Sequence, residues 1–147
     1  MNTRWKRCLA AAGLAAALAV PAAGCSDGEG GPSDVASRAI ASATAAVDDK
    51  LHEIKGGVNA KDQVTLGAPD RDADGRTTVV ITARNTAGSP KSFAVQIIYR
   101  DPGGNLLDTV LVTLPDIPAG SSAKATARSN RDLSGDVRAE TGTALRY

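Results

Sequence analysis

The stretch FAVQIIYR, residues 93–100, decides the fold class because its large apolar residues recur at every second position. That spacing is the period of a β-strand with one face turned to a core. The apolar set is Phe93, Val95, Ile97 and Tyr99, and it alternates with Ala94, Gln96 and Arg100. We therefore expect a strand here whose four large side chains do not all face solvent.

The same period extends to both sides of this stretch. Further strands are predicted at 64–66, 77–85, 106–114, 123–128 and 137–145. Turn signals at Asp101-Pro102-Gly103-Gly104-Asn105 and Pro118-Ala119-Gly120 separate them, and Pro115 is expected to break the chain. With no helix pattern between them, six or seven short strands predict a mainly β, antiparallel sandwich rather than a parallel sheet.

Four segments also carry a resemblance. The run Asn85 to Gly88, the strand 93–99, the turn 101–105 and the turn 118–120 occur in the order found in small immunoglobulin-like envelope domains of the FxLYD type. The pattern departs at Arg100, which separates Tyr99 from Asp101. The resemblance covers about residues 64–144, implies an immunoglobulin-like sandwich for residues 58–147, and brings no catalytic residue with it.

An alanine-rich segment precedes the strands. Ser33 or Asp34 is a suitable N-cap, and Gly56-Gly57 would end a helix that runs to about Lys55, so residues 33–57 are assigned as a helical spacer. One stripe of apolar residues recurs at steps of three or four: Ala36, Ile40, Ala43, Val47, Leu51 and Ile54. This narrow stripe could dock on the β domain, pair with another copy or remain a stalk, and we expect a spacer that is at least partly docked.

The N-terminal segment has the order of parts of a secretory signal. Three basic residues come first, an apolar run spans residues 8–20, and Ala22-Ala23-Gly24-Cys25 follows. These four residues resemble the lipobox of bacterial lipoproteins, with Ala22 where Leu is commoner. The resemblance implies a cleaved signal helix at 1–24, covalent diacylglycerol on Cys25 as the only prosthetic group, a flexible tether at 25–32, and a lipid-anchored place on the extracytoplasmic face of the cell membrane. The whole layout also resembles lipoproteins of Gram-positive actinobacteria whose function is uncharacterised.

The net charge argues against one class of partner, and the cysteine content excludes a disulfide. The part from Cys25 onward carries 14 basic and 16 acidic residues, a net charge of −2, which argues against a nucleic-acid partner. The two cysteines lie in the signal and at the lipid site, so none remains to form a disulfide.

Two groups of side chains are candidate metal ligands. Asp70, Asp72, Asp74 and Gly75 match the start of a calcium loop, but the twelfth position is Ile81 instead of a bidentate Glu. We interpret this run as a solvated acidic turn, with a weak calcium site as the alternative. His52 lacks a second His or a free Cys as a zinc partner, so we expect it to be an exposed helix residue near Asp48.

The run Arg128 to Gly135 is the candidate recognition segment. It places Arg128, Asn130 and Arg131 in what the sequence predicts to be a connection between strands, and such loops commonly carry binding residues. The alternative is an Asx turn with a solvated Arg131-Asp132 pair.

The sequence gives little support to an enzyme. A Ser-His-acid triad would have to recruit His52, the only histidine, from the helical spacer, and no glycine loop that could cradle a phosphate is followed by Lys and a helix. We expect a non-enzymatic lipoprotein that displays its sandwich for interaction with an envelope protein or for envelope organisation. An extracytoplasmic sensor that binds a solute or calcium is the alternative.

Overall fold

The computed structural model describes residues 32–147, in which strands predominate. The expected signal peptide 1–24, the lipidation residue Cys25 and the tether residues 25–31 lie outside the described part. No helix within residues 32–147 is long and apolar enough to span a membrane.

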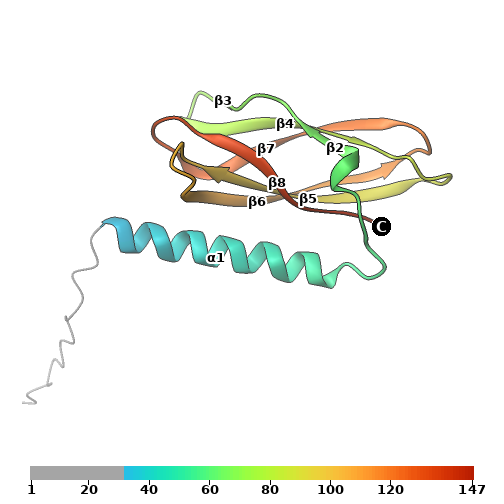
Figure 1. Cartoon of the computed structure of the whole chain (residues 1–147), viewed down its shortest axis with the longest axis horizontal. Coiled ribbons are helices and arrows are strands. Elements are labelled where there is room, and N and C mark those ends of the chain that lie inside the picture. The colour runs from blue at the N-terminus through green and yellow to red at the C-terminus, as the bar shows by residue number, and fades with distance from the viewer. Residues whose placement is uncertain (1–31) are drawn as a thin grey trace, which may run out of the picture.

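Two antiparallel sheets form a sandwich, which confirms the predicted fold class (Figure 1). The first sheet has the order β1 (Val58–Asn59), β8 (Arg138–Arg146), β5 (Lys91–Arg100) and β6 (Leu106–Ile117). In the second, β4 (Arg76–Arg84) pairs with β2 (Val64–Leu66), β3 (Asp70–Arg71) and β7 (Ser122–Asp132). The described part thus holds eight strands instead of six or seven, because the two-residue strands β1 and β3 are too short to show a period of two. A 3-10 turn, Lys61–Gln63, leads into β2.

The space between the sheets is filled by alternate side chains of the long strands. The four large residues of β5 that the sequence singled out, Phe93, Val95, Ile97 and Tyr99, are all fully buried. They meet Val79, Ile81 and Ala83 of β4 across the sandwich. The inner face predicted for β5 is therefore correct.

Strand β6 is longer than the sequence predicted. Pro115 does not break it, and the strand continues to Ile117. The pairing with β5 shifts between Lys91 and Phe93, opposite this proline, and Asp116 has a positive φ of 47°. An edge strand at a bulge tolerates a residue without an N–H group, which explains why Pro115 fits there.

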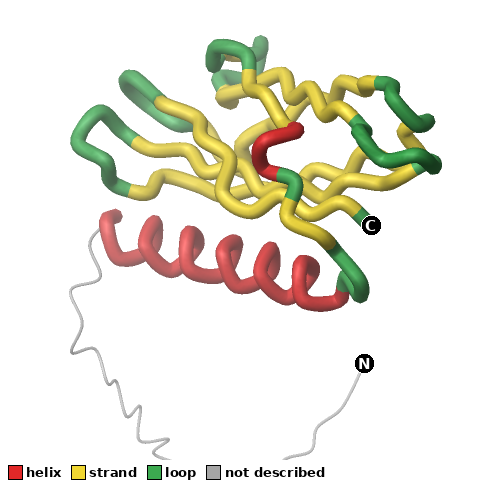
Figure 2. Tube along the Cα trace, turned by 45° about the vertical axis from the view of Figure 1, so that its right-hand side comes forward, coloured by secondary structure: helices red, strands yellow, loops and turns green. Residues whose placement is uncertain are grey.

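Helix α1 (Pro32–Glu53) packs against the outer face of the sheet that contains β5 (Figure 2). Val47 and Leu51 form a buried cluster with Ala94, and Ile54, Leu111 and Leu145 pack around it. The expectation of a docked helix is confirmed, and the predicted stripe is the side that faces the sheet. The helix begins at Pro32, so Ser33 and Asp34 lie in its first turn instead of capping it, and Pro32 belongs to the helix rather than to the tether.

The helix makes the two sheets and the two ends of the sandwich different. We call the sheet under α1 the covered sheet, and the sheet of β2, β3, β4 and β7 the open sheet, whose outer face α1 leaves free (Figure 1). The near end lies beside the start of α1 and holds the turns 72–75, 101–105 and 133–137. The far end holds the connections 85–90 and 118–121 and the C-terminal Tyr147.

Candidate functional site

The acidic turn at the near end is paired with an arginine from β7. Arg128 Nε donates a hydrogen bond to Asp72 Oδ2 at 2.5 Å, and Arg128 Nη2 donates to Asp74 Oδ2 at 2.6 Å. Asp72 Oδ1 accepts hydrogen bonds from the backbone N–H groups of Asp74 and Arg76 at 3.0 Å. The hydrogen bond from Arg128, above all, holds the pKa of Asp72 below its ordinary value.

The carboxylates of the calcium-like run 70–75 are already engaged by groups of the chain itself. Asp70 turns its Oδ1 to the backbone N–H of Arg71 at 2.8 Å, and its neighbours Asp72 and Asp74 point to Arg128. Within residues 32–147, no three His, Cys, Asp or Glu side chains are placed to hold a metal ion together. A cation would have to displace a guanidinium that already makes two charge-assisted hydrogen bonds.

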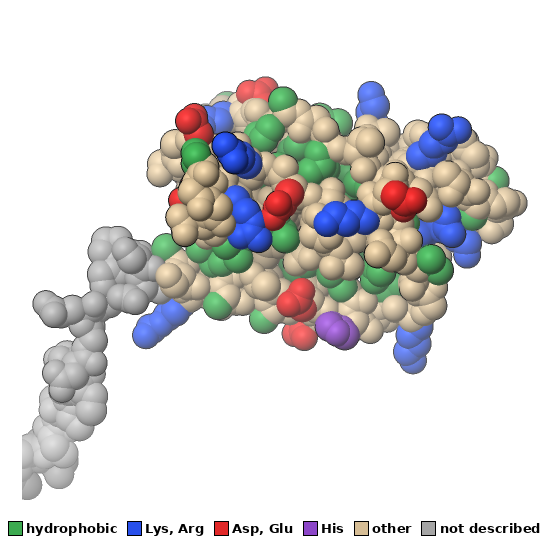
Figure 3. Space-filling model, viewed as in Figure 1, with side chains coloured by type: hydrophobic (Ala, Val, Ile, Leu, Met, Phe, Trp, Pro, Cys, Tyr) green, Lys and Arg blue, Asp and Glu red, His purple; other side chains and the backbone are tan. Residues whose placement is uncertain are grey.

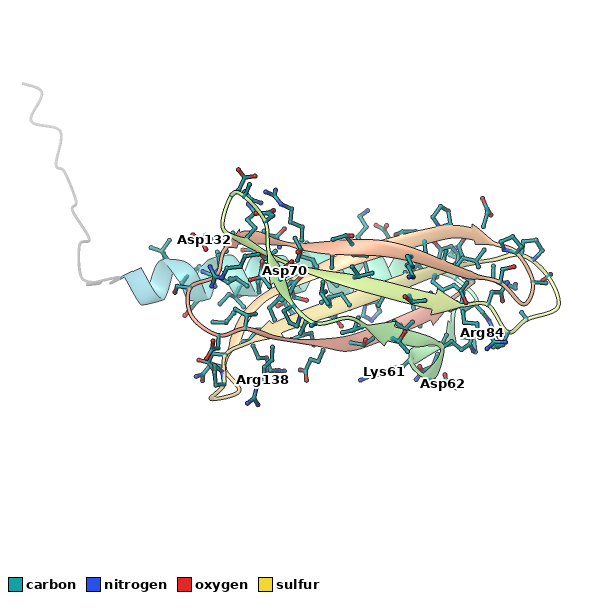
Figure 4. The ribbon with its side chains drawn as sticks, turned by 90° about the horizontal axis from the view of Figure 1, so that it is seen from above. Lys61, Asp62, Asp70, Arg84, Asp132 and Arg138 are labelled. Carbon is teal, nitrogen blue, oxygen red and sulfur yellow. The ribbon has the colours of Figure 1, made fainter. Side chains whose placement is uncertain are left out.

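Arg71 fastens the same turn to the connection between β7 and β8. Its guanidinium donates to the carbonyl oxygens of Leu133 and Gly135 and forms an ion pair with Asp132 at 3.4 Å. Asp132 is therefore paired with Arg71. The alternative interpretation of the sequence, a pair between Arg131 and Asp132, is wrong. Figure 4 shows Asp70, Asp132 and Arg138 toward this end of the sandwich.

The predicted recognition residues lie in strand β7 and not in a connection between strands. Arg128, Asn130 and Arg131 all precede the end of β7 at Asp132. Asn130 Nδ2 donates to Asp108 Oδ1 at 3.1 Å and to the Thr109 carbonyl oxygen at 3.0 Å, and Arg131 donates to the Leu107 carbonyl oxygen. All three side chains thus bind groups of their own chain.

The sequence predicted that this strand ends at residue 128, because Ser129 stands at the next inward position, where an apolar residue is expected. Ser129 is buried, and its hydroxyl group accepts a hydrogen bond from the backbone N–H of Thr77 at 3.0 Å and donates to the Arg131 carbonyl oxygen at 2.6 Å. A buried serine with such partners continues the strand as an alanine would.

His52 is exposed on α1, as expected. Its Nδ1 lies 2.7 Å from the carbonyl oxygen of Asp48, so the contact is with the backbone of Asp48 and not with its carboxylate. Within the described residues, the imidazole of His52 thus contacts a backbone carbonyl group on the helix surface and forms no pair with a carboxylate.

The far end holds a polar cleft that the sequence did not point to. It has a volume of about 380 Å³ and lies over β2, β4 and the start of β7. The hydroxyl-bearing residues Thr65, Thr82, Thr86 and Ser122 line it together with Arg84. We call this hollow the far cleft; its residues come from three separate stretches of the chain, 62–65, 82–86 and 122, which is why no local motif marks them.

Comparison of the chain with protein-family models, with curated proteins and with solved structures gave no match.

Proposed function

We propose that the chain is a non-enzymatic lipoprotein, anchored through diacylglycerol on Cys25, that displays its sandwich on the extracytoplasmic face of the cell membrane to bind an envelope protein. The lipobox-like sequence Ala22 to Cys25 supports the anchor. Two acyl chains hold a protein stably on a bilayer where one chain does not. The resemblance to immunoglobulin-like FxLYD domains supports a role in binding rather than in catalysis.

One structural observation carries the proposal of an interaction domain: the helix covers one sheet and leaves the other free. Val80, at the middle of β4 in the open sheet, is 45% exposed, and its strand neighbours on that face are Thr78 and Thr82. The inner face of the same strand is closed by the core. The open sheet is therefore the broad surface that a partner can reach.

The docked helix also fixes how far the domain stands from the anchor. About six residues separate Cys25 from Pro32, and extended chain spans at most about 3.5 Å per residue, so the near end lies within about 25 Å of the anchoring residue. A free helical stalk of 22 residues would have added about 33 Å. With α1 lying along the sandwich, the near end is kept beside the membrane.

Site-specific cross-linking in cells tests the interaction. A photo-reactive residue at Val80 should give a discrete cross-linked product with an envelope protein, because this position faces outward on the open sheet. The same residue at Ala39, which is exposed on α1, is the matched control and should give none. Equal products from both positions, or none from Val80, would remove the open sheet as the interaction surface.

A further inference from the structure

Charge is distributed unequally between the two ends of the sandwich. Among residues 32–147, four ion pairs lie at the near end and involve Arg71, Arg100 and Arg128, and the fifth joins Lys50 to Glu53 on α1. The far end carries Lys61, Arg84, Lys91, Lys124 and Arg146, with Asp62 and Asp116 as its acidic side chains. None of these cations forms an ion pair within the described part of the chain. In Figure 3, blue Lys and Arg side chains gather at the far end, whereas red and blue mix at the near end.

Three of these cations surround the far cleft. Arg84 lines it, and Lys124 stands opposite Thr82 in the register of β4 and β7, so that it flanks the cleft on the outer face. Residues opposite one another in an antiparallel pair have Cβ atoms about 5 Å apart. The side chains of Arg84 and Lys124 make no hydrogen bond within residues 32–147, so their donors are free for a ligand.

Arg146 reaches the cleft from the covered sheet. Its Nη1 donates to Gln63 Oε1 at 3.1 Å and to Thr86 Oγ1 at 3.3 Å, and both acceptor residues line the cleft. These neutral partners leave the positive charge of Arg146 uncompensated. Asp62 is the one carboxylate in the lining, and Figure 4 shows it with Lys61 and Arg84 toward the same end of the molecule.

We infer that the far cleft binds a phosphate group. A guanidinium fork matches two phosphate oxygens, and an ammonium supplies a point charge to a third. The hydroxyl groups of Thr65, Thr82, Thr86 and Ser122 provide neutral donors around them. This set of donors exceeds the two acceptor oxygens of a carboxylate, and it suits the larger number of oxygens on phosphate.

The place of the cleft bears on the source of that phosphate. Strand β4 runs from the near end to the cleft, and the eight steps from Arg76 to Arg84 span about 26 Å at roughly 3.3 Å per residue. If the chain is anchored through Cys25 as proposed above, the cleft points away from the bilayer that holds it. Soluble phosphate or a phosphate ester in the envelope is then the expected ligand, rather than a lipid headgroup.

The experiment uses the chain purified from cells in non-ionic detergent. Inorganic phosphate is titrated against chloride at constant pH and ionic strength while backbone amide NMR shifts are followed. The wild-type protein should show saturable shifts at Thr82, Arg84 and Ser122. Arg84→Gln and Lys124→Gln should each weaken the affinity by about tenfold or more, because each removes a charge-assisted hydrogen bond to the ligand.

Arg138→Gln is the matched control, since Arg138 is an exposed cation at the near end whose side chain has no hydrogen bond within the described residues. Its affinity for phosphate should equal that of the wild type. Shifts that grow linearly with phosphate, or an equal loss in Arg138→Gln and Arg84→Gln, would overturn the inference.

Two further probes separate the sources of the phosphate. Glycerol 3-phosphate should reproduce the saturable shifts and their dependence on Arg84. Vesicles of phosphatidylglycerol should not bind more tightly than vesicles of phosphatidylcholine. Arg84-dependent binding to the phosphatidylglycerol vesicles would overturn the assignment to a soluble source. Because the titration follows the sandwich itself, a failure of the proposed anchor at Cys25 would leave the result at the cleft unchanged.

Discussion

Asn130 in β7 donates its backbone N–H to Asp108 Oδ2 in β6 at 2.6 Å. Asp108 is only 2% exposed, and its Oδ1 also accepts from Asn130 Nδ2 at 3.1 Å and from the backbone N–H of Thr109 at 2.8 Å. Strands β6 and β7 belong to different sheets and share no backbone ladder. One buried carboxylate thus joins the edges of the two sheets at the near end.

Asp108→Ala should destabilise the protein by about 2 kcal/mol or more, because three charge-assisted hydrogen bonds are lost and the part-buried donors of Asn130 lose this partner. Urea denaturation measures the change in the free energy of unfolding. Asp136→Ala, an exposed carboxylate in the next connection, is the control and should change stability by less than about 0.5 kcal/mol. Equal effects of the two substitutions would show that Asp108 does not join the sheets.

Tyr99 predicts a loss of stability in alkali. Burial, with a smaller contribution from the charge of Asp108, raises the pKa of its hydroxyl well above the ordinary value of 10.0. Above about pH 10 the unfolded chain releases this proton and the folded chain keeps it, so stability should fall as pH rises, by at most about 1.4 kcal/mol per pH unit.

Tyr99→Phe removes this titrating group. Its buried hydroxyl group has no hydrogen-bond partner within the described residues, so the substitution should be nearly neutral at pH 7. Above pH 10 the variant should lose less stability than the wild type. Parallel pH profiles for the two proteins would contradict the buried, protonated state of Tyr99.

The pairing of Arg128 predicts the behaviour of the acidic turn. Arg128→Gln should raise the pKa of Asp72 toward the ordinary value of 3.8, because the main cause of its depression is the hydrogen bond from Arg128. NMR titration of the side-chain carboxyl group measures it. Lys124→Gln, on the same strand, should leave this pKa unchanged.

In the wild type, calcium chloride should not shift the melting temperature relative to sodium chloride of equal ionic strength, and a saturable shift would show that a cation displaces Arg128.

The docking of α1 predicts unequal costs along one helix. Leu51 is 8% exposed within the cluster of Val47 and Ala94, so Leu51→Ala should destabilise the protein by about 2 to 3 kcal/mol. Val35 on the same helix is 66% exposed, and Val35→Ala should change stability by less than about 0.5 kcal/mol. Amide hydrogen exchange should also be faster across α1 in Leu51→Ala. Equal exchange in both variants would mean that the helix is not held through Leu51.

The fold class could be predicted from the sequence because alternation is a local property of each long strand. The inward sets of β4 and β5 and the helix stripe that contains Val47 and Leu51 are visible without any knowledge of pairing. The lengths of the strands were less predictable than their inward faces. Pro115 lies inside β6 because it coincides with a bulge, and the bulge is defined by the partner strand and not by the proline itself.

Local sequence patterns could not predict the hydrogen bonds between side chains of different strands. Asp108 reads as one polar residue within an apolar strand, and its partner Asn130 follows 22 residues later on another sheet. Arg128 is similarly distant from Asp72 in sequence, although β4 and β7 bring the two together. The far cleft combines three distant stretches of the chain in the same way. These contacts depend on which strands become neighbours, and the alternation of residues does not encode that choice.

Mass spectrometry of the protein isolated from cells shows whether the chain is processed and lipidated at Cys25. We expect a chain that begins at Cys25 and carries diacylglycerol on its sulfur atom, with residues 1–24 removed. A chain that keeps residues 1–24, or one with a free thiol at Cys25, would contradict it.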